Sequence, residues 1–162
     1  MTRSKDKPQV KLQDGNRDKA KGRSRNEPKT RPTDMPLDTF VDSLPEAQRG
    51  DARQLSALMQ AVTGEPPVVW GGNIVGFGQY AQQYADGRQL PWPLLAFSPR
   101  ARELSLYLMD GVSGQQALLA TLGPHRTGKC CLYIRRLSDV SMPALRQLLE
   151  ASVQALAPLR IR

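Results

Sequence analysis

The sequence predicts an α+β fold in which helices cover a single antiparallel sheet of about four strands, in the element order ααβββαβα. Apolar residues recur at helical spacing between positions 37 and 62 and again between 141 and 156. Between 68 and 109 the chain is rich in aromatic and β-branched residues separated by glycine and proline, which is typical of strands. The connections between these strands are short, so neighbouring strands should be antiparallel.

The distribution of charge divides the chain into two parts. Residues 1–33 hold 11 Lys and Arg against 4 Asp and Glu, a net charge of +7, whereas the remaining 129 residues carry a net charge of +1. Residues 1–33 contain few apolar side chains, so burial cannot offset the entropy that they would lose on ordering. We therefore expect a disordered basic tail over 1–33 and one folded domain over 34–162.

Two helices are expected at the start of the domain. The first spans about Pro36–Ser43, with its apolar residues on one face. Residues 43–46 match a capping box, in which Ser43 would be the N-cap of the second helix. The second helix should end at Gly64, because glycine adopts the left-handed conformation of a helix C-cap and two prolines follow it.

Three strands are then expected, over Ile74–Tyr84, Trp92–Ser98 and Glu103–Leu108. Turn residues at 85–88 and 98–100 separate them. The remaining elements are helices and one further strand.

A helix capped by Ser113 should end at Gly123 and Pro124. It is followed by a strand over Cys130–Arg135. The last helix is expected from about Ser141, where leucines again recur on one face.

The stretch 122–134 combines the single histidine, His125, with both cysteines and a glycine–lysine pair. Gly123 to Lys129 satisfy G-x-x-x-x-G-K, but Cys130 occupies the position of the magnesium-binding Ser or Thr. The stretch also leads from a helix into a strand, the reverse of a phosphate loop. One histidine is too few for a tetrahedral zinc site with these cysteines, and no G-x-S-x-G motif is present. We therefore predict no catalytic residues.

A candidate binding site is predicted at the same turn. His125 and Lys129 lie on it, Tyr133 shares the strand face of Lys129 by alternation, and Arg100 could join them from a neighbouring hairpin. Cationic side chains next to the amides of a glycine turn suit a small anionic ligand or an acidic peptide. The alternative is that these residues form the turn, fill the core or are simply exposed.

Two other sets of side chains are candidates. Trp70 and Tyr80 either line a ligand pocket or belong to the core. Asp38, Asp42 and Glu46 recur every four residues, so on one helix face their oxygens could hold a metal ion weakly. The alternative for these acidic residues is an ordinary solvated helix face.

Several motifs carry a resemblance to a known family. They are GEPP at 64–67, WG at 70–71, IVGFGQY at 74–80, FSPR at 97–100, LSLY at 104–107 and LGPHRTGKCCLYI at 122–134. Over about 37–156 the chain thereby resembles the YdhG-like bacterial domain of unknown function, which is grouped by fold with frataxin-like proteins. The resemblance implies a compact α+β domain. Because some members are described as iron chaperones, it also implies iron as a ligand to test.

Together these features predict a non-catalytic binding or chaperone-like domain for iron or a small anionic ligand. The adjacent cysteines point to opposite faces of a strand, so they suit a reducing, cytoplasmic compartment better than a disulfide. No apolar run approaches the ~20 residues of a membrane span, and no secretory or transit signal is recognised. One alternative is a nucleic-acid-associated protein whose basic tail makes weak, non-specific contacts. The third is an enzyme of unknown type.

Overall fold

The structure is a computed structural model that describes residues 30–112 and 114–161. The chain divides into two units, Met1–Arg31 and Pro32–Arg162, and the helices and strands of the described residues belong to the second. Of the predicted disordered tail 1–33, residues 1–29 lie outside the described residues. The predicted helix cap Ser113 is wrong, because Gln115 is the N-cap of the helix Gln116–Leu122.

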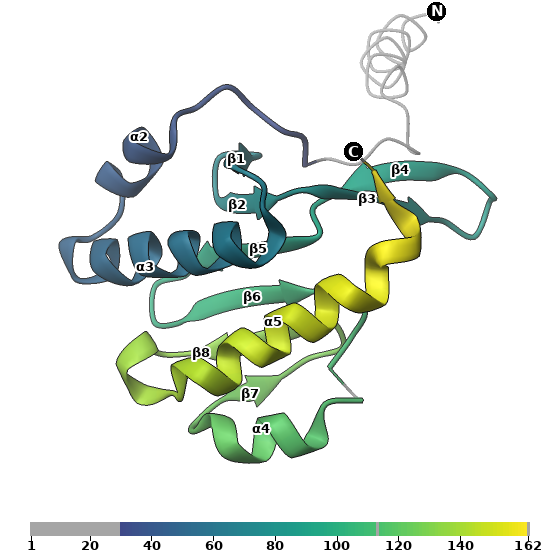
Figure 1. Cartoon of the computed structure of the whole chain (residues 1–162). Helices are drawn as coiled ribbons and strands as arrows, with labels where there is room; N and C mark the ends of the chain where they lie inside the picture. Colours follow the sequence, from purple (N-terminus) through teal and green to yellow (C-terminus); the bar gives the residue numbers. More distant parts are fainter. Residues whose placement is uncertain (1–29, 113, 162) are drawn as a thin grey trace, which may run out of the picture. The chain divides into compact units, whose positions relative to one another are not determined.

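The second unit has the predicted α+β composition (Figure 1). Its helices are α2 (Leu37–Asp42), α3 (Glu46–Thr63), α4 (Gln116–Leu122) and α5 (Met142–Leu156), with 3-10 turns η1 (Leu137–Asp139) and η2 (Ala157–Leu159). Its strands are β1 (Pro67–Trp70), β2 (Ile74–Phe77), β3 (Gln79–Gln83), β4 (Gln89–Trp92), β5 (Leu95–Pro99), β6 (Leu104–Leu108), β7 (Arg126–Thr127), β8 (Cys131–Ile134) and β9 (Arg160–Ile161).

The strands form two sheets instead of the predicted single sheet of about four strands. A 6-stranded sheet has the order β1-β2-β5-β6-β8-β7, and a 3-stranded sheet has the order β4-β3-β9. Each of these strand pairs is antiparallel, as the short connections predicted. The α+β class is therefore confirmed, and the single sheet is corrected.

The second sheet arises because the predicted strand Ile74–Tyr84 is divided at Gly78. This residue has φ +67°, a left-handed conformation that breaks the extended backbone between β2 and β3. A Cβ there would lie 2.7 Å from Leu94 Cδ1, so the packing also favours glycine. The predicted strand Trp92–Ser98 is also divided: Trp92 ends β4, and β5 begins at Leu95 after Pro93 and Leu94.

Three short strands were missed by the sequence prediction. β1 starts at Pro67, a residue read as a helix terminator, but a proline is tolerated where a strand begins at a sheet edge. β7 and β9 have 2 residues each, too few to show alternation. The segment before α2 is also attached to β1, because the backbone N–H and the hydroxyl of Thr33 both donate to the Val69 carbonyl at 2.8 Å.

Apart from the start of α4, the helix ends follow local sequence with one exception. α3 ends at Gly64 with φ 75°, as predicted, and α5 begins after Ser141, whose hydroxyl accepts a hydrogen bond from the Ala144 N–H. The predicted capping box is wrong, because Pro45 occupies the N-cap of α3. Ser43 instead donates to the Phe40 carbonyl at 2.6 Å and satisfies the end of α2.

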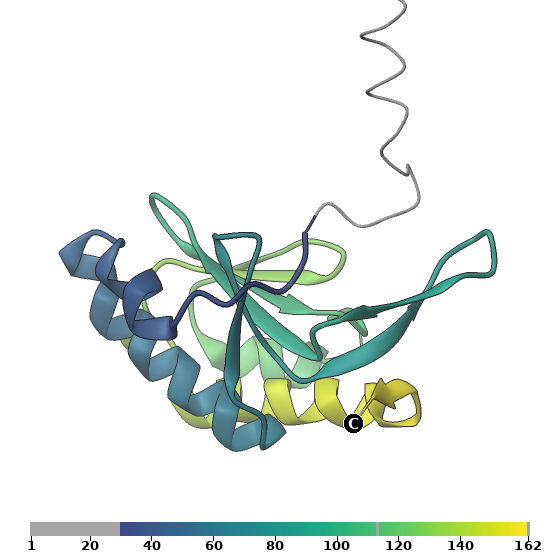
Figure 2. The same ribbon diagram turned by 90° about the horizontal axis from the view of Figure 1, so that it is seen from above.

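The core lies between the six-stranded sheet and the helices α3 and α5, which cover one of its faces (Figure 2). Large buried side chains from the sheet and from α3 fill this layer: Phe77, Phe97, Leu106, Leu55 and Met59. The residues that alternate with the core positions in β6 and β8 point to the other face of the sheet. That face and its β7 edge are therefore where polar side chains can gather.

Candidate functional site

β7 and the turn before it place polar side chains at one edge of the six-stranded sheet. β7 is the last strand in the sheet order, and Arg126 lies opposite Tyr133 of β8. The turn begins at Gly123, immediately after α4. The Nδ1 atom of His125 lies 2.7 Å from the Gly123 carbonyl oxygen, so the imidazole is held against the backbone of the turn.

Arg126 is the central side chain of this edge. Its guanidinium lies over the ring of Tyr133, 4.4 Å from the centroid, and donates to both carboxylate oxygens of Glu103 at 2.9 and 2.7 Å. The side chain of Arg126 still keeps 66% of its surface exposed. The pKa of the Tyr133 phenol is raised, first by a hydrogen bond with the Cys131 side chain and second by the charge of Cys131. The phenol is therefore neutral at physiological pH.

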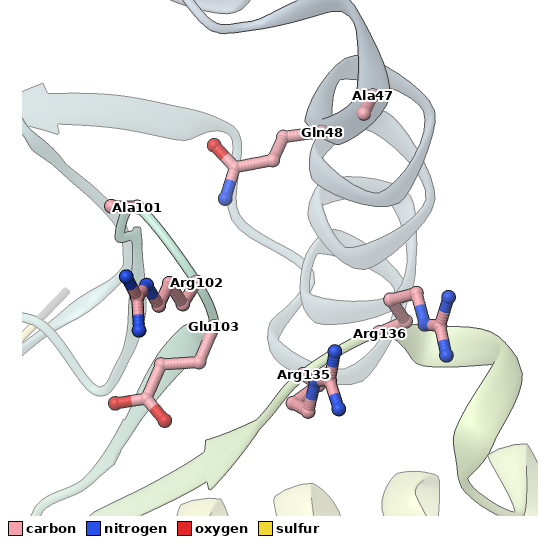
Figure 3. A pocket seen from close by; sticks show the side chains of 7 residues that line it. All are labelled: Ala47, Gln48, Ala101, Arg102, Glu103, Arg135 and Arg136. Atoms are coloured by element: carbon pink, nitrogen blue, oxygen red, sulfur yellow. The ribbon is translucent and has the colours of Figure 1, made fainter.

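One hollow of about 630 Å³ lies between the start of α3, the turn after β5 and the residues after β8 (Figure 3). Its lining is rich in arginine: Ala47, Gln48, Ala101, Arg102, Glu103, Arg135 and Arg136. The side-chain amide of Gln48 donates to the Arg100 carbonyl and so holds the turn after β5 against α3. The three arginines of this hollow are therefore positioned by the turn after β5 and by the segment after β8, with α3 as the opposite wall.

Two more hollows continue from it along the β7 edge. The middle one, of about 260 Å³, shares Glu103 and Arg135 with the first and also contains Arg126 and Tyr133. The far one, of about 570 Å³, is lined by Val112, Gln116, Leu119, Ala120, His125, Thr127, Gly128 and Lys129. His125 lines both the middle and the far hollow. We call these three adjoining hollows the basic track.

Some cations of the basic track are neutralised within the domain and others are not. Arg126 is paired with Glu103, and Arg136 lies 3.6 Å from a carboxylate oxygen of Asp139. In the part of the chain that the structure describes, Arg102, Arg135 and Lys129 have no acidic partner. The basic track therefore carries positive charge that is available to a ligand.

The four predicted residues of the turn site are only partly brought together. His125 and Lys129 line the same hollow, and Tyr133 lines the adjoining one with His125. Arg100 is not a lining residue of the basic track; its guanidinium donates to the Tyr107 hydroxyl at 3.2 Å. Sequence reasoning missed Arg126, although the motif at 122–134 contains it, because this residue precedes the predicted strand Cys130–Arg135.

The structure places both aromatic candidates inside the protein. Trp70 is 2% exposed and packs edge to face against Trp92, with 5.6 Å between the ring centroids. Trp70 also lines a separate hollow together with Gln79. Tyr80 is 3% exposed, and its hydroxyl donates to the side-chain carbonyl of Gln82. Both rings thus stabilise the packing between the two sheets.

Tyr80 should make stability sensitive to alkaline pH. Burial, and then the charges of nearby groups, raise the pKa of its phenol from 10.0 to about 12. The folded protein therefore holds this proton more tightly than the unfolded chain. The protonated phenol adds to the free energy of unfolding in full below pH 10, and this stabilisation is lost as pH rises towards 12. Between pH 7 and 12, the free energy of unfolding measured by chemical denaturation should decrease less steeply for Tyr80→Phe than for wild type. The control Tyr107→Phe, at a partly exposed ring that is not among the groups raising this pKa, should keep the steep decrease in stability. Equal slopes for wild type and Tyr80→Phe would contradict this.

Two of the three acidic candidates, Asp38 and Asp42, face an arginine. Arg53 of α3 donates to an Asp38 carboxylate oxygen at 2.8 Å and lies 3.8 Å from one of Asp42. Glu46 is the first residue of α3 and is exposed. Among the residues that the structure describes, no group of three or more His, Cys, Asp or Glu side chains is placed to hold a metal ion. Asp38 and Asp42 belong to α2 and Glu46 to α3, so the three carboxylates do not share one helix.

Comparisons with known proteins yield no relative from which a function could be transferred. No protein-family model, no curated protein and no solved structure matches the chain. None of the helices in the described ranges combines the length and the apolar character of a membrane span. The basic track is therefore interpreted from its own geometry and charge.

Proposed function

We propose that this chain is a non-catalytic binding protein for an anionic partner, which it holds in the basic track. The observation that carries the proposal is the set of cations without an acidic partner among the described residues, Arg102, Arg135 and Lys129, around adjoining hollows. We assign the domain to the YdhG-like family with a frataxin-like arrangement on the motif resemblance alone, and we place it in the cytoplasm because its adjacent cysteines suit a reducing compartment.

The geometry favours binding through side-chain hydrogen bonds. Guanidinium groups present several donors in one plane, which suits phosphate and carboxylate oxygens. Glu103 is occupied by both hydrogen bonds from Arg126, so it competes little with a ligand for Arg135. A ligand in the first hollow can therefore approach Arg102 and Arg135 without displacing an existing ion pair.

The surroundings of His125 favour binding over catalysis. Nucleophilic catalysis requires a hydroxyl or thiol hydrogen-bonded to a base such as histidine. The hydrogen bond described for His125 is with the Gly123 backbone carbonyl. The imidazole is thereby held as a fixed polar group on the wall of two hollows, where it can contact a ligand.

Removing two of the available cations should weaken anion binding. For full-length protein titrated calorimetrically with inorganic pyrophosphate, Arg102→Ala with Arg135→Ala should raise the Kd about 10- to 100-fold, since a charge-assisted hydrogen bond contributes about 1.5–3 kcal/mol. The thermal unfolding midpoint should change little, because both side chains are exposed.

The matched control removes two arginines that already have acidic partners. Arg88→Ala with Arg146→Ala changes the net charge equally but affects the surface pairs with Asp86 and Glu150. Pyrophosphate affinity should stay within about twofold of wild type, apart from the small general effect of net charge. The proposal fails if both double variants lose affinity equally, or if wild type does not bind pyrophosphate at all.

A further inference from the structure

The cations of the basic track do not converge on a single point. Figure 3 shows Arg135 between α3 and the turn after β5, whereas the guanidinium of Arg102 points away from α3 and that of Arg136 points to the opposite side. Lys129 lies in the far hollow, which is connected to the others through His125. One compact anion cannot contact all of these groups. Their distribution favours an extended ligand that carries negative charge at intervals.

The middle of the basic track offers a different kind of contact. Arg126 lies close enough over Tyr133 for a cation–π contact at 4.4 Å, and its charge is already matched by Glu103. The guanidinium is held from two sides, yet the side chain remains 66% exposed. A planar, immobilised and partly exposed guanidinium is a surface on which a nucleic-acid base can stack.

We infer that the basic track binds single-stranded nucleic acid. A base stacks on Arg126, while phosphates on one side contact Arg135 and Arg102 and a phosphate on the other side contacts Lys129. This inference rests on the proposed function and specifies its ligand. An acidic peptide would match the charge equally well, but its carboxylate side chains cannot stack on the planar surface at Arg126 as a base can.

The basic tail contributes charge without base selectivity. Residues 1–33 carry a net charge of +7, and no aromatic residue precedes Phe40. The tail can therefore attract a polyanion electrostatically but cannot stack aromatic rings on its bases. The arginines of the tail can also stack on bases, so in measurements on the full chain the contribution of the folded domain is identified by comparing wild type with Arg126→Lys, which leaves the tail unchanged.

The test compares three labelled probes of equal length by fluorescence anisotropy: an oligouridylate of about ten nucleotides, its abasic sugar-phosphate counterpart and an oligoglutamate. Wild type should bind the oligouridylate most tightly. Arg126→Lys keeps the charge and can still pair with Glu103, but it removes the planar group. It should weaken oligouridylate binding about tenfold, the effect of one stacked base, and leave abasic binding unchanged.

The flanking cations should behave differently from Arg126. Arg135→Ala and Lys129→Ala should each weaken both sugar-phosphate probes to a similar extent. Each should also reduce the slope of log affinity against log salt by about one, the signature of a lost phosphate contact. The control Arg146→Ala, on α5 and outside the basic track, should leave this slope unchanged.

Several results would overturn the inference. Oligoglutamate bound as tightly as oligouridylate would identify an acidic peptide as the ligand. Equal binding of the abasic and base-containing probes by wild type would show that base stacking does not contribute to binding. An equal effect of Arg126→Lys on both probes would show that Arg126 has a structural role and does not stack on a base. If pyrophosphate binds through Arg102 and Arg135 but these results occur, only this inference fails. If pyrophosphate does not bind either, the proposed function fails with it.

Discussion

Replacing Gly123 with alanine should lower the free energy of unfolding by roughly 3 kcal/mol or more. Gly123 has φ 115° and ψ −168°, a combination that is essentially restricted to glycine. A Cβ at this position would also lie 2.7 Å from the Asp139 carbonyl oxygen and 3.3 Å from the Val140 Cα. Both obstacles are backbone atoms, so no rotation of a side chain can relieve the clash.

The backbone around Gly123 cannot easily move away. The Ser141 N–H donates to the Leu122 carbonyl at 2.8 Å, which ties the end of α4 to the start of α5. Relief of the clash would break this hydrogen bond and shift His125, whose Nδ1 is anchored on the Gly123 carbonyl. His125 lines the middle and far hollows, so Gly123→Ala should also weaken oligouridylate binding, even under conditions in which the variant remains folded.

Urea unfolding followed by circular dichroism measures the first effect, and the control is a second glycine-to-alanine change. Gly50 lies inside α3 with no atom within 4 Å of an added Cβ. Gly50→Ala should raise the free energy of unfolding by roughly 0.5–1 kcal/mol, because alanine favours helix. A Gly123→Ala protein with the denaturation midpoint of wild type would show that the turn is less constrained than the structure indicates.

Replacing Arg160 with alanine should be the second large effect, a loss of roughly 2–4 kcal/mol. Arg160 is only 12% exposed, and its Nη2 donates to the Thr63 carbonyl at 2.7 Å and to the Glu65 carboxylate at 3.1 Å. It thereby attaches β9 to the end of α3, while Tyr80 of β3 is its partner across the sheet. Arg160→Ala leaves the partly buried Glu65 carboxylate and the Thr63 carbonyl at the end of α3 without this donor.

The net value of this contact is limited by its own desolvation. The Nε of Arg160 is buried and has no hydrogen-bond partner within the described part of the chain, so part of the gain from the ion pair is offset. A double-mutant cycle with Glu65→Gln isolates the pairwise term by thermal or urea unfolding. Arg146→Ala, which removes a half-exposed arginine paired along α5 with Glu150, should change stability by no more than about 0.5 kcal/mol. Equal destabilisation by Arg160→Ala and Arg146→Ala would refute the role of Arg160.

The candidate site was only partly accessible to sequence reasoning. His125 and Lys129 are close in sequence on one turn, so their shared hollow could be anticipated. Arg126 and Glu103 are 23 residues apart, and their contact depends on the pairing of β7 with β8 and of β8 with β6. The predicted partner Arg100 is on the adjacent turn but is oriented towards Tyr107. The orientation of a side chain at a turn is a tertiary property that spacing alone does not reveal.

The elements that local sequence determined are those whose causes are also local. α3 and α5 follow from apolar residues at helical spacing, and Gly64 and Ser141 mark the end of α3 and the start of α5 by acting on backbone groups within a few residues. The α+β class follows from the same patterns. These features require no knowledge of which segments meet in space.

The tertiary structure alone decided which strands share a sheet and where charge is available. The division at Gly78 sends β2 and β3 into different sheets, although the sequence reads as one continuous strand across both. The two-residue strands β7 and β9 exist because β8 and β3 satisfy their backbone groups. Likewise, Arg126 is neutralised and Arg135 is not because the folded sheet sets Glu103 beside the former. The sheet to which a strand belongs and the partner of each charged side chain depend on contacts between residues that are distant in sequence. These residues form their hydrogen bonds and ion pairs only after the chain has folded.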